Sequence, residues 1–322
     1  MMVYTPKSIF LYLFGAWGKT GINCFVLITG YYMCKSEITL RKFLKLLLEV
    51  EFYEITIYFT LLFIGINDFS IRDLIFYTIP IRSITNSNFT DCYLIFFLFI
   101  PFLNILIKNM SQKEHLRLML LFILIYSVIG KIPLISMCLN YVTWFCVLYV
   151  IGSYLRLYPY HKANLNLWGK LSVIFITLSI MSVLGAMKVA SILGVQISRG
   201  VAYFFIEDSN ALLAVATSVC VFMYFKNLKI RRSRLINAAG GGTFGVLLIH
   251  DNLQIRPWLW TNLLNNEKVF QSGNVYQHAI LSVISIFIIC ILIEQCRKKT
   301  IERPLIEFTY KYISRSIQIF KK

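Results

Sequence analysis

The stretch GINCFVLITGYYM, residues Gly21–Met33, is apolar apart from Asn23 and Thr29. Together with the residues from Trp17 onward, it forms a run that approaches the length of a membrane-spanning helix. A secretory signal peptide would combine such a run with a charged leading segment and a small-residue cleavage site, and neither is found here. The stretch is therefore predicted to be a transmembrane helix.

The composition extends this interpretation to the whole chain. Of the 322 residues, 58% are hydrophobic and 16% are aromatic, and the mean hydropathy is +0.69. A soluble globular domain of this length would need far more polar surface. The composition therefore predicts an all-α, polytopic membrane protein, built as a bundle of transmembrane helices without a soluble domain.

About nine apolar runs have roughly the length that a bilayer core demands. The predicted spans are Trp17–Met33, Leu44–Ile66, Tyr93–Ile107, Leu116–Lys131, Tyr141–Leu157, Leu167–Met187, Ala211–Phe225, Thr243–Trp260 and Tyr276–Cys296. The run Leu74–Ile81 is too short to span and is interpreted as an interfacial or re-entrant piece. Residues 1–322 are predicted to form a single membrane domain that ends in a basic cytoplasmic tail, residues 297–322.

The net charge of +17 comes from Lys and Arg residues that gather just outside the apolar runs. This distribution excludes a nucleic-acid partner, which would need basic residues interleaved on one solvated face. Alternate connections and the C-terminal tail hold most of the 32 Lys and Arg residues, so the C-terminus is predicted to be cytoplasmic. The basic connection Lys226–Arg234 is interpreted as a topology determinant beside anionic lipid, and contact with the phosphates of a donor is the alternative.

An odd number of spans places the N-terminus outside the cell. One hypothesis is that a first helix preceding Met1 is missing, so that the parent protein has an even number of spans and both ends in the cytoplasm. A genuine outside N-terminus is the other hypothesis.

Four segments resemble, in the same order, the motifs of the acyltransferase-3 family of integral membrane acyltransferases. GKTGINCFVLITGYYM resembles the family's G-x-x-G-V-x-x-F-F-V-L-S-G-Y signature, and TWFCVLYVIGSYL resembles its aromatic helix ending in F-x-x-G-x-Y-L. GGTFGVLLIHDN is similar to the family's S-F-G-[IV]-Y-L-I-H segment, and IERPLIEF is similar to its closing I-E-[KR]-P element. The resemblance runs from Gly18 to Phe308.

The resemblance implies a bundle of about ten transmembrane helices in the bacterial inner membrane. It also implies an O-acyltransferase of polysaccharide biosynthesis, which moves an acyl group, usually acetyl, from cytoplasmic acyl-CoA to a hydroxyl of a lipid-linked or surface glycan. The family's catalytic His and a preceding Arg lie on its first helix. Neither has a counterpart in this chain, which agrees with the hypothesis of a missing first helix and puts the activity of the recorded chain in question.

His250 is the candidate base that remains in the sequence. An alcohol is a poor nucleophile at neutral pH, and a base with a pKa near 7 can take its proton as the thioester is attacked. His250 lies within the predicted span Thr243–Trp260, and the nearby Asp251 and Arg256 are candidate substrate-binding residues. Direct catalysis, a lining role at the substrate site and a purely structural role all stay open. His115 and His278 are predicted to be solvated or interfacial.

Carboxylates at the start of the second predicted span are the other candidates. Glu51 and Glu54 share roughly one helical face and are candidate substrate-binding residues, with an ordinary interfacial helix start as the alternative. Lys45 is expected to pair with Glu49, four residues later.

No bound cofactor or metal is expected. The eight Cys residues are scattered without metal-ligand spacing, and no phosphate-binding glycine motif is present. Acyl-CoA is expected only as the donor substrate, and the sequence does not indicate an oligomeric state.

Two other classes of membrane protein remain as alternatives. A lipid-linked polysaccharide polymerase or flippase would share the many helices and the basic inner loops. A small-solute transporter would more often show repeat-related halves, and no such symmetry is visible.

Overall fold

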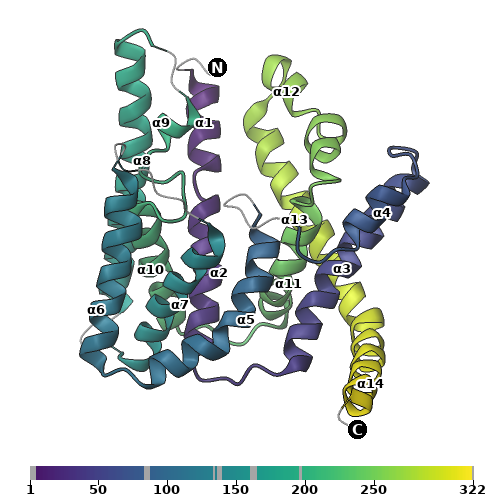
Figure 1. Cartoon of the computed structure of the whole chain (residues 1–322). Coiled ribbons are helices and arrows are strands. Elements are labelled where there is room, and N and C mark those ends of the chain that lie inside the picture. Colours follow the sequence, from purple (N-terminus) through teal and green to yellow (C-terminus); the bar gives the residue numbers. More distant parts are fainter. Residues whose placement is uncertain are drawn as a thin grey trace. The chain divides into compact units, whose positions relative to one another are not determined.

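The structure is a computed structural model that describes residues 5–82, 88–132, 135, 140–159, 165–195 and 198–320, apart from the side chains of 272 and 314–320. All regular structure in these residues is helical, which confirms the all-α prediction. The chain divides into two compact units (Figure 1). Unit 1 comprises Met1–Glu37 and Ile84–Ile230, and unit 2 comprises Ile38–Ser83 and Arg231–Lys322.

Unit 1 is a helical bundle in which α2 packs against both α7 and α10. Side chains cap several of its helices, as the Ser111 hydroxyl does for α6 in a complete capping box with Glu114. Its helices are α1 (Pro6–Gly15), α2 (Gly18–Met33), α5 (Phe89–Lys108), α6 (Gln112–Ile123), the π-helix η1 (Leu124–Val128), the 3-10 helix η2 (Ile129–Lys131), α7 (Tyr141–Leu157), α8 (Leu165–Ile192), α9 (Arg199–Ala202) and α10 (Leu212–Asn227).

Two glycines set the close approach of α2 and α7 in unit 1. A Cβ atom on Gly30 would lie 2.7 Å from the carbonyl oxygen of Tyr149, and one on Gly152 would lie 2.7 Å from that of Leu27. Both obstacles are backbone atoms, which cannot move aside as a flexible side chain can. Gly30 and Gly152 therefore allow the backbones of α2 and α7 to pack closely.

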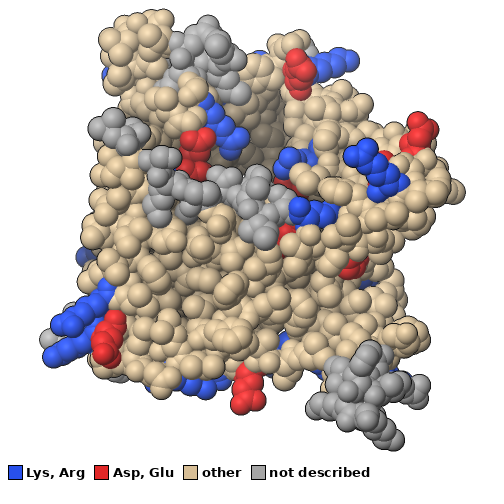
Figure 2. Space-filling view, viewed as in Figure 1, with Lys and Arg blue, Asp and Glu red and all other residues tan. Residues whose placement is uncertain are grey.

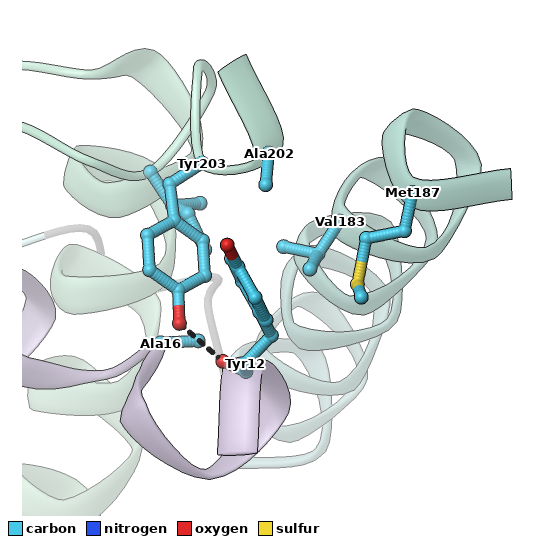
Figure 3. Packing of buried hydrophobic residues seen from close by; sticks show 7 residues of the cluster. Tyr12, Ala16, Val183, Met187, Ala202 and Tyr203 are labelled. Carbon is cyan, nitrogen blue, oxygen red and sulfur yellow. Dashed lines mark hydrogen bonds between the residues drawn. The ribbon is translucent and has the colours of Figure 1, made fainter. Parts of the chain in front are cut away.

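A second contact region of unit 1 joins α1, α8 and the segment around α9 (Figure 3). The Tyr12 and Tyr203 rings lie 5.2 Å apart, and the Tyr203 hydroxyl donates to the backbone carbonyl of Tyr12 at 2.6 Å. Val183 and Met187 of α8 complete the apolar cluster. The buried phenol therefore keeps a hydrogen-bond partner inside an apolar contact.

Unit 2 is built around α13, which packs against α11, while α3 packs against both α11 and α14. Gly245 makes the α11 contact possible, because a Cβ there would lie 2.6 Å from the Glu294 carboxylate. The helices of unit 2 are α3 (Leu40–Phe63), α4 (Ile71–Tyr77), α11 (Arg234–His250), the π-helix η3 (Trp258–Leu263), α12 (Asn266–Ser272), α13 (Val275–Arg297), the π-helix η4 (Lys298–Glu302) and α14 (Arg303–Phe320).

Four helical segments among the described residues are long and apolar enough to cross a membrane, namely Pro6–Met33, Phe89–Lys108, Leu165–Ile192 and Val275–Ile313. Tyr141–Leu157 and Leu212–Asn227 are shorter apolar helices. On the face of unit 1 that Figure 2 shows, a broad stretch carries hardly any charged side chains, which gather toward the helix ends. These features fit a membrane protein, and the figure of nine spans stays a prediction.

The predicted span Thr243–Trp260 is wrong as a single helix. Helix α11 ends at His250, and helical backbone resumes at Arg256, just before the π-helix η3 that begins at Trp258. Between the two helical segments the Asn252 side chain accepts a hydrogen bond from the backbone N–H of Gln254 at 2.9 Å, as in an Asx turn. His250 therefore lies at a helix end and not inside a span.

The short run Leu74–Ile81 corresponds to α4, which has seven residues and does not reach spanning length. The C-terminal tail is helical from Arg303 to Phe320 in α14, and residues 321 and 322 lie outside the described residues.

Candidate functional site

The end of α11 lies beside α3 in unit 2, and polar side chains from both segments meet there. The Gln254 amide donates to the Glu54 carboxylate at 3.2 Å and to the Glu54 backbone carbonyl at 3.2 Å. The Arg82 guanidinium contacts the same carboxylate, with NH2 2.6 Å from Oε1 and NH1 3.1 Å from Oε2. This two-point contact is the geometry in which a guanidinium binds a carboxylate most strongly. We refer to Glu54, Arg82 and Gln254 as the Glu54 group.

Helix α4 holds the Arg82 guanidinium from the other side. The Arg82 Cζ atom lies 5.4 Å from the centre of the Phe76 ring and 5.6 Å from that of Tyr77. The side chains of Arg82 and Glu54 are only 8% and 13% exposed. Aromatic faces and a shielded environment both strengthen the attraction between the two charges. The short helix after α3 thus positions an ion pair.

His250 is half-buried at the end of α11, and its Nδ1 atom lies 2.6 Å from the carbonyl oxygen of Val246. A carbonyl oxygen can only accept a hydrogen bond, so Nδ1 carries the ring hydrogen in this arrangement. In the neutral ring, Nε2 then keeps its lone pair. The geometry gives His250 the tautomer that a general base acting through Nε2 requires.

The structure brings the predicted substrate-binding residues Asp251 and Arg256 together as an ion pair. Arg256 NH1 lies 3.1 Å from Asp251 Oδ1, and both side chains are about half exposed. An exposed pair of this kind is weakly held, so each member remains accessible to another polar partner.

The two predicted α3 carboxylates differ in what they contact. Glu54 is part of the Glu54 group, whereas Glu51 is half-buried three residues earlier on α3. The expected pairing of Lys45 with Glu49 is wrong. Lys45 binds Glu302 at 2.7 Å, and Glu49 binds Arg297 of α13 at 3.3 Å. Contacts between helices displaced the local pairing, since Arg297 offers Glu49 a buried partner.

Arg297 lies at the centre of a second polar group that the sequence interpretation missed. Its guanidinium contacts Glu294 at 2.8 and 2.9 Å and Glu302 at 3.1 Å, in addition to Glu49. The Tyr53 hydroxyl donates to Glu294 at 2.6 Å. We call Glu49, Tyr53, Glu294, Arg297 and Glu302 the Arg297 cluster. A Glu inside the apolar run of α13 was the available signal, because ionisable residues in such runs are costly.

A cavity of about 520 Å³ lies between α3, α13 and the segment around His250. Most of its lining is apolar, and Ile249 and Ile255 contribute from either side of the helix end. Thr56 and Thr60 of α3 add hydroxyl groups, and Arg297 borders the cavity. An apolar hollow with a few polar groups is the usual form of a small-molecule site.

Metal ligation has no counterpart in the described part of the chain, where no group of three or more His, Cys, Asp or Glu side chains could hold a metal ion. The expectations of no bound metal and no bound cofactor stay predictions.

The prediction for His115 is wrong. His115, in the first turn of α6, is fully buried, with Nε2 3.0 Å from the Val150 carbonyl of α7 and the ring edge to face with those of Tyr154 and Tyr158. Burial lowers the pKa of His115 below its ordinary value of 6.5. Packing of α6 on α7 overrides the basic surroundings of His115 in the sequence. His278 is half-buried, and its Nε2 lies 2.9 Å from Asn266 Oδ1, so its solvated or interfacial role stays a prediction.

No family model, curated protein or solved structure matches this chain.

Proposed function

We propose that the protein is a membrane-bound O-acyltransferase. It moves an acyl group, most simply acetyl, from cytoplasmic acyl-CoA to a hydroxyl of a lipid-linked or surface glycan. The observation that carries the proposal is the His250 ring, whose Nδ1 hydrogen bond to Val246 leaves Nε2 able to accept a proton. The topology of the proposal is multi-pass, with about nine spans and a cytoplasmic C-terminus.

In the proposed reaction, Nε2 of His250 takes the proton of the acceptor hydroxyl as the oxygen attacks the thioester carbonyl. The C–O ester bond forms and the C–S bond breaks. The proton then passes from the imidazolium to the departing thiolate, which gives free CoA. Asp251 and Arg256 are assigned to contact substrate hydroxyls, because Asp251 follows His250 in the chain and both side chains of the pair are accessible. Glu51 and the Glu54 group are assigned to the polar wall of the same site.

The four motifs of the resemblance support a shared architecture. The first two contain Gly30 and Gly152, which pack their helices together in unit 1. The third contains Gly245, which makes room for Glu294 in unit 2. The fourth contains Glu302, which joins Glu294 on the Arg297 guanidinium. Gly30, Gly152, Gly245 and Glu302 therefore serve helix packing, whereas His250 of the third motif carries the proposed chemistry.

A transport function is the second candidate, and the Arg297 cluster is the observation that favours it. Three carboxylates and an arginine meet at the end of an apolar helix, and ionisable groups within membrane helices commonly line ion or substrate paths. A transporter would leave the acylation of the glycan unchanged, so one experiment separates the two functions.

The test compares envelope glycan from cells that lack the gene with glycan from cells complemented by it. Base-labile acetate is the measurement, and we expect it only in the complemented cells. Equal acetate in both strains would overturn the acyltransferase proposal and favour transport. Complementation with His250→Ala is expected to remove the acetate, whereas His278→Ala, at another half-buried histidine of the same unit, is expected to retain it. Immunoblots check that the variants are present in equal amounts. Wild-type levels of acetate with His250→Ala would exclude His250 as the base.

A further inference from the structure

Two cations from different helices of unit 1 converge on one buried tyrosine ring. Tyr31, near the end of α2, is only 4% exposed. Arg156 of α7 lies with its Cζ 4.9 Å from the ring centre and donates from NH1 to the Tyr31 hydroxyl at 3.1 Å. Lys226 of α10 lies with its Nζ 5.5 Å from the same ring centre. The packing of α2 against α7 and α10 brings these residues together.

No carboxylate balances this pair of charges in the described residues. Other cations of the structure, including Arg82, Lys131, Arg256 and Arg297, each form an ion pair with Asp or Glu. Neither Arg156 nor Lys226 forms an ion pair with a described residue. A third cation, Lys35, lies just beyond α2, within electrostatic range of Cys34 together with Arg156. The site thus carries an excess of positive charge.

The C-terminal ends of the neighbouring helices balance only part of this positive charge. Helices α2, α7 and α10 all end near these residues, and the partial negative charge of a helix C-terminus stabilises a cation. A guanidinium has five N–H donors and an ammonium has three. Tyr31 and Asn227 accept one hydrogen bond each from Arg156 and Lys226, respectively, so most of these donors have no acceptor among the described residues.

The available donors match a phosphate group. Arg156 presents a planar fork that suits phosphate oxygens, and Lys226 adds a mobile point charge from a second helix. The Tyr31 ring, which both cations contact, packs edge to face against Phe222, with the ring centres 5.4 Å apart. Arg156 is half-buried and Lys226 is exposed, so a phosphate can reach both from solvent or from the membrane surface.

We propose that Arg156, Lys226 and Tyr31 form a binding site for the phosphate group of an organic phosphate. Lys35 adds to the attraction of the site. A soluble phosphate ester such as coenzyme A and the headgroup of an anionic phospholipid present the same chemistry. The site lies in unit 1, and its occupation does not depend on whether the protein transfers acyl groups.

The first arm of the test measures binding of coenzyme A and of inorganic phosphate to the full chain in nanodiscs of phosphatidylcholine. Arg156→Met with Lys226→Met is expected to weaken binding by roughly tenfold or more, because charge-assisted hydrogen bonds are lost. Lys229→Met with Arg232→Met removes the same charge from exposed positions just beyond α10, and affinity should change by less than about twofold.

The second arm replaces part of the phosphatidylcholine with phosphatidylglycerol and measures the thermal midpoint of unfolding. A rise in the midpoint that the Arg156/Lys226 variant loses, and the control variant keeps, assigns the site to a lipid headgroup. The single variant Lys226→Met is added because Lys226 is exposed, so that its replacement should leave the fold intact. This variant should weaken binding in whichever arm of the test is positive. If folded variants and wild type respond equally to coenzyme A, phosphate and phosphatidylglycerol, the proposal is overturned.

Discussion

The two units bury different kinds of polar side chain. In unit 1, nearly all the buried polar residues among those described are hydroxyls and amides, and Asp91 is the exception that carries a charge. In the described part of unit 2, three of the five buried polar residues are charged, namely Glu49, Glu294 and Arg297. The first unit holds its helices together with neutral hydrogen bonds, and the second places ions between its helices.

Two buried amides of unit 1 illustrate these neutral contacts. The Asn23 amide donates to the Ser209 carbonyl at 2.7 Å and accepts from the Trp144 indole at 3.1 Å. The Tyr149 hydroxyl donates to Asn104 Oδ1 at 2.6 Å. Neutral pairs cost little to bury once they are satisfied, whereas buried ions depend strongly on each partner. The comparison indicates that the fully buried polar groups of unit 1 mainly serve packing, whereas those of unit 2 include ions that depend on specific partners.

The largest expected effect is on the ions of unit 2. Arg297→Met leaves three carboxylates around a side chain that cannot neutralise them, and removing one partner of a buried ion pair costs about 3–5 kcal/mol. Thermal unfolding in detergent should show the loss. Arg303→Met, which removes an exposed pair with Glu307, is the matched control and should change stability by less than about 1 kcal/mol. Equal effects of the two variants would remove the distinction between the units.

The second-largest effect on stability is expected where the backbones of α2 and α7 meet in unit 1. Gly152→Ala places a methyl group 2.7 Å from the Leu27 carbonyl oxygen, and overpacking of this kind costs about 1–3 kcal/mol. Gly21→Ala in α2 meets no atom within 4 Å and should be neutral or stabilising by up to about 1 kcal/mol, as alanine favours helix. Denaturant titrations of both variants measure the difference. A tolerated Gly152→Ala would contradict the close packing of α2 and α7.

A smaller effect is expected from the neutral hydrogen bonds. Tyr149→Phe removes the donor to Asn104 and leaves a buried amide oxygen short of one partner, at a cost of about 1–2 kcal/mol. Tyr32→Phe, at a side chain that is 59% exposed, should leave stability unchanged. Thermal midpoints of the two variants give the comparison. If Tyr149→Phe lost as much stability as Arg297→Met, unit 1 would depend on its polar contacts as strongly as unit 2 does.

The smallest effect is a pH dependence that arises from His115. Its pKa in the folded protein is lowered by burial, so the unfolded chain binds the proton more readily. The stability contributed by the neutral ring is complete above pH 6.5 and is lost as the pH falls from there through the folded pKa. Unfolding between pH 7.5 and about 5 should show this slope.

His115→Gln is the variant that isolates this slope, because it removes the titrating group and keeps a polar side chain. The variant should flatten the pH profile relative to wild type. His278→Gln is the control, because His278 is only half-buried whereas His115 is fully buried, and this variant should keep the wild-type slope. An unchanged slope in His115→Gln would assign the pH dependence to other groups.

The helices were predicted well because hydropathy and length are local properties. The run Tyr141–Leu157 is helical over the same residues as predicted, and most other spans shift by a few residues. The error at Thr243–Trp260 arose because an apolar run hides the Asx turn at Asn252 that ends α11. That error placed His250 inside a span, although the structure has it at a helix end.

The sequence by itself determined the class of the protein, since composition and the spacing of apolar runs indicate long apolar helices without reference to any partner. It also singled out His250, Asp251, Arg256, Glu51 and Glu54, because polar residues stand out against such runs. Only the tertiary structure decided which charges pair. Tyr53 and Glu294 are 241 positions apart, and the contact between them depends on how α3 and α13 pack. The local pattern of apolar residues specifies a helix, but the partner of a buried ion depends on how all the helices of the unit pack together.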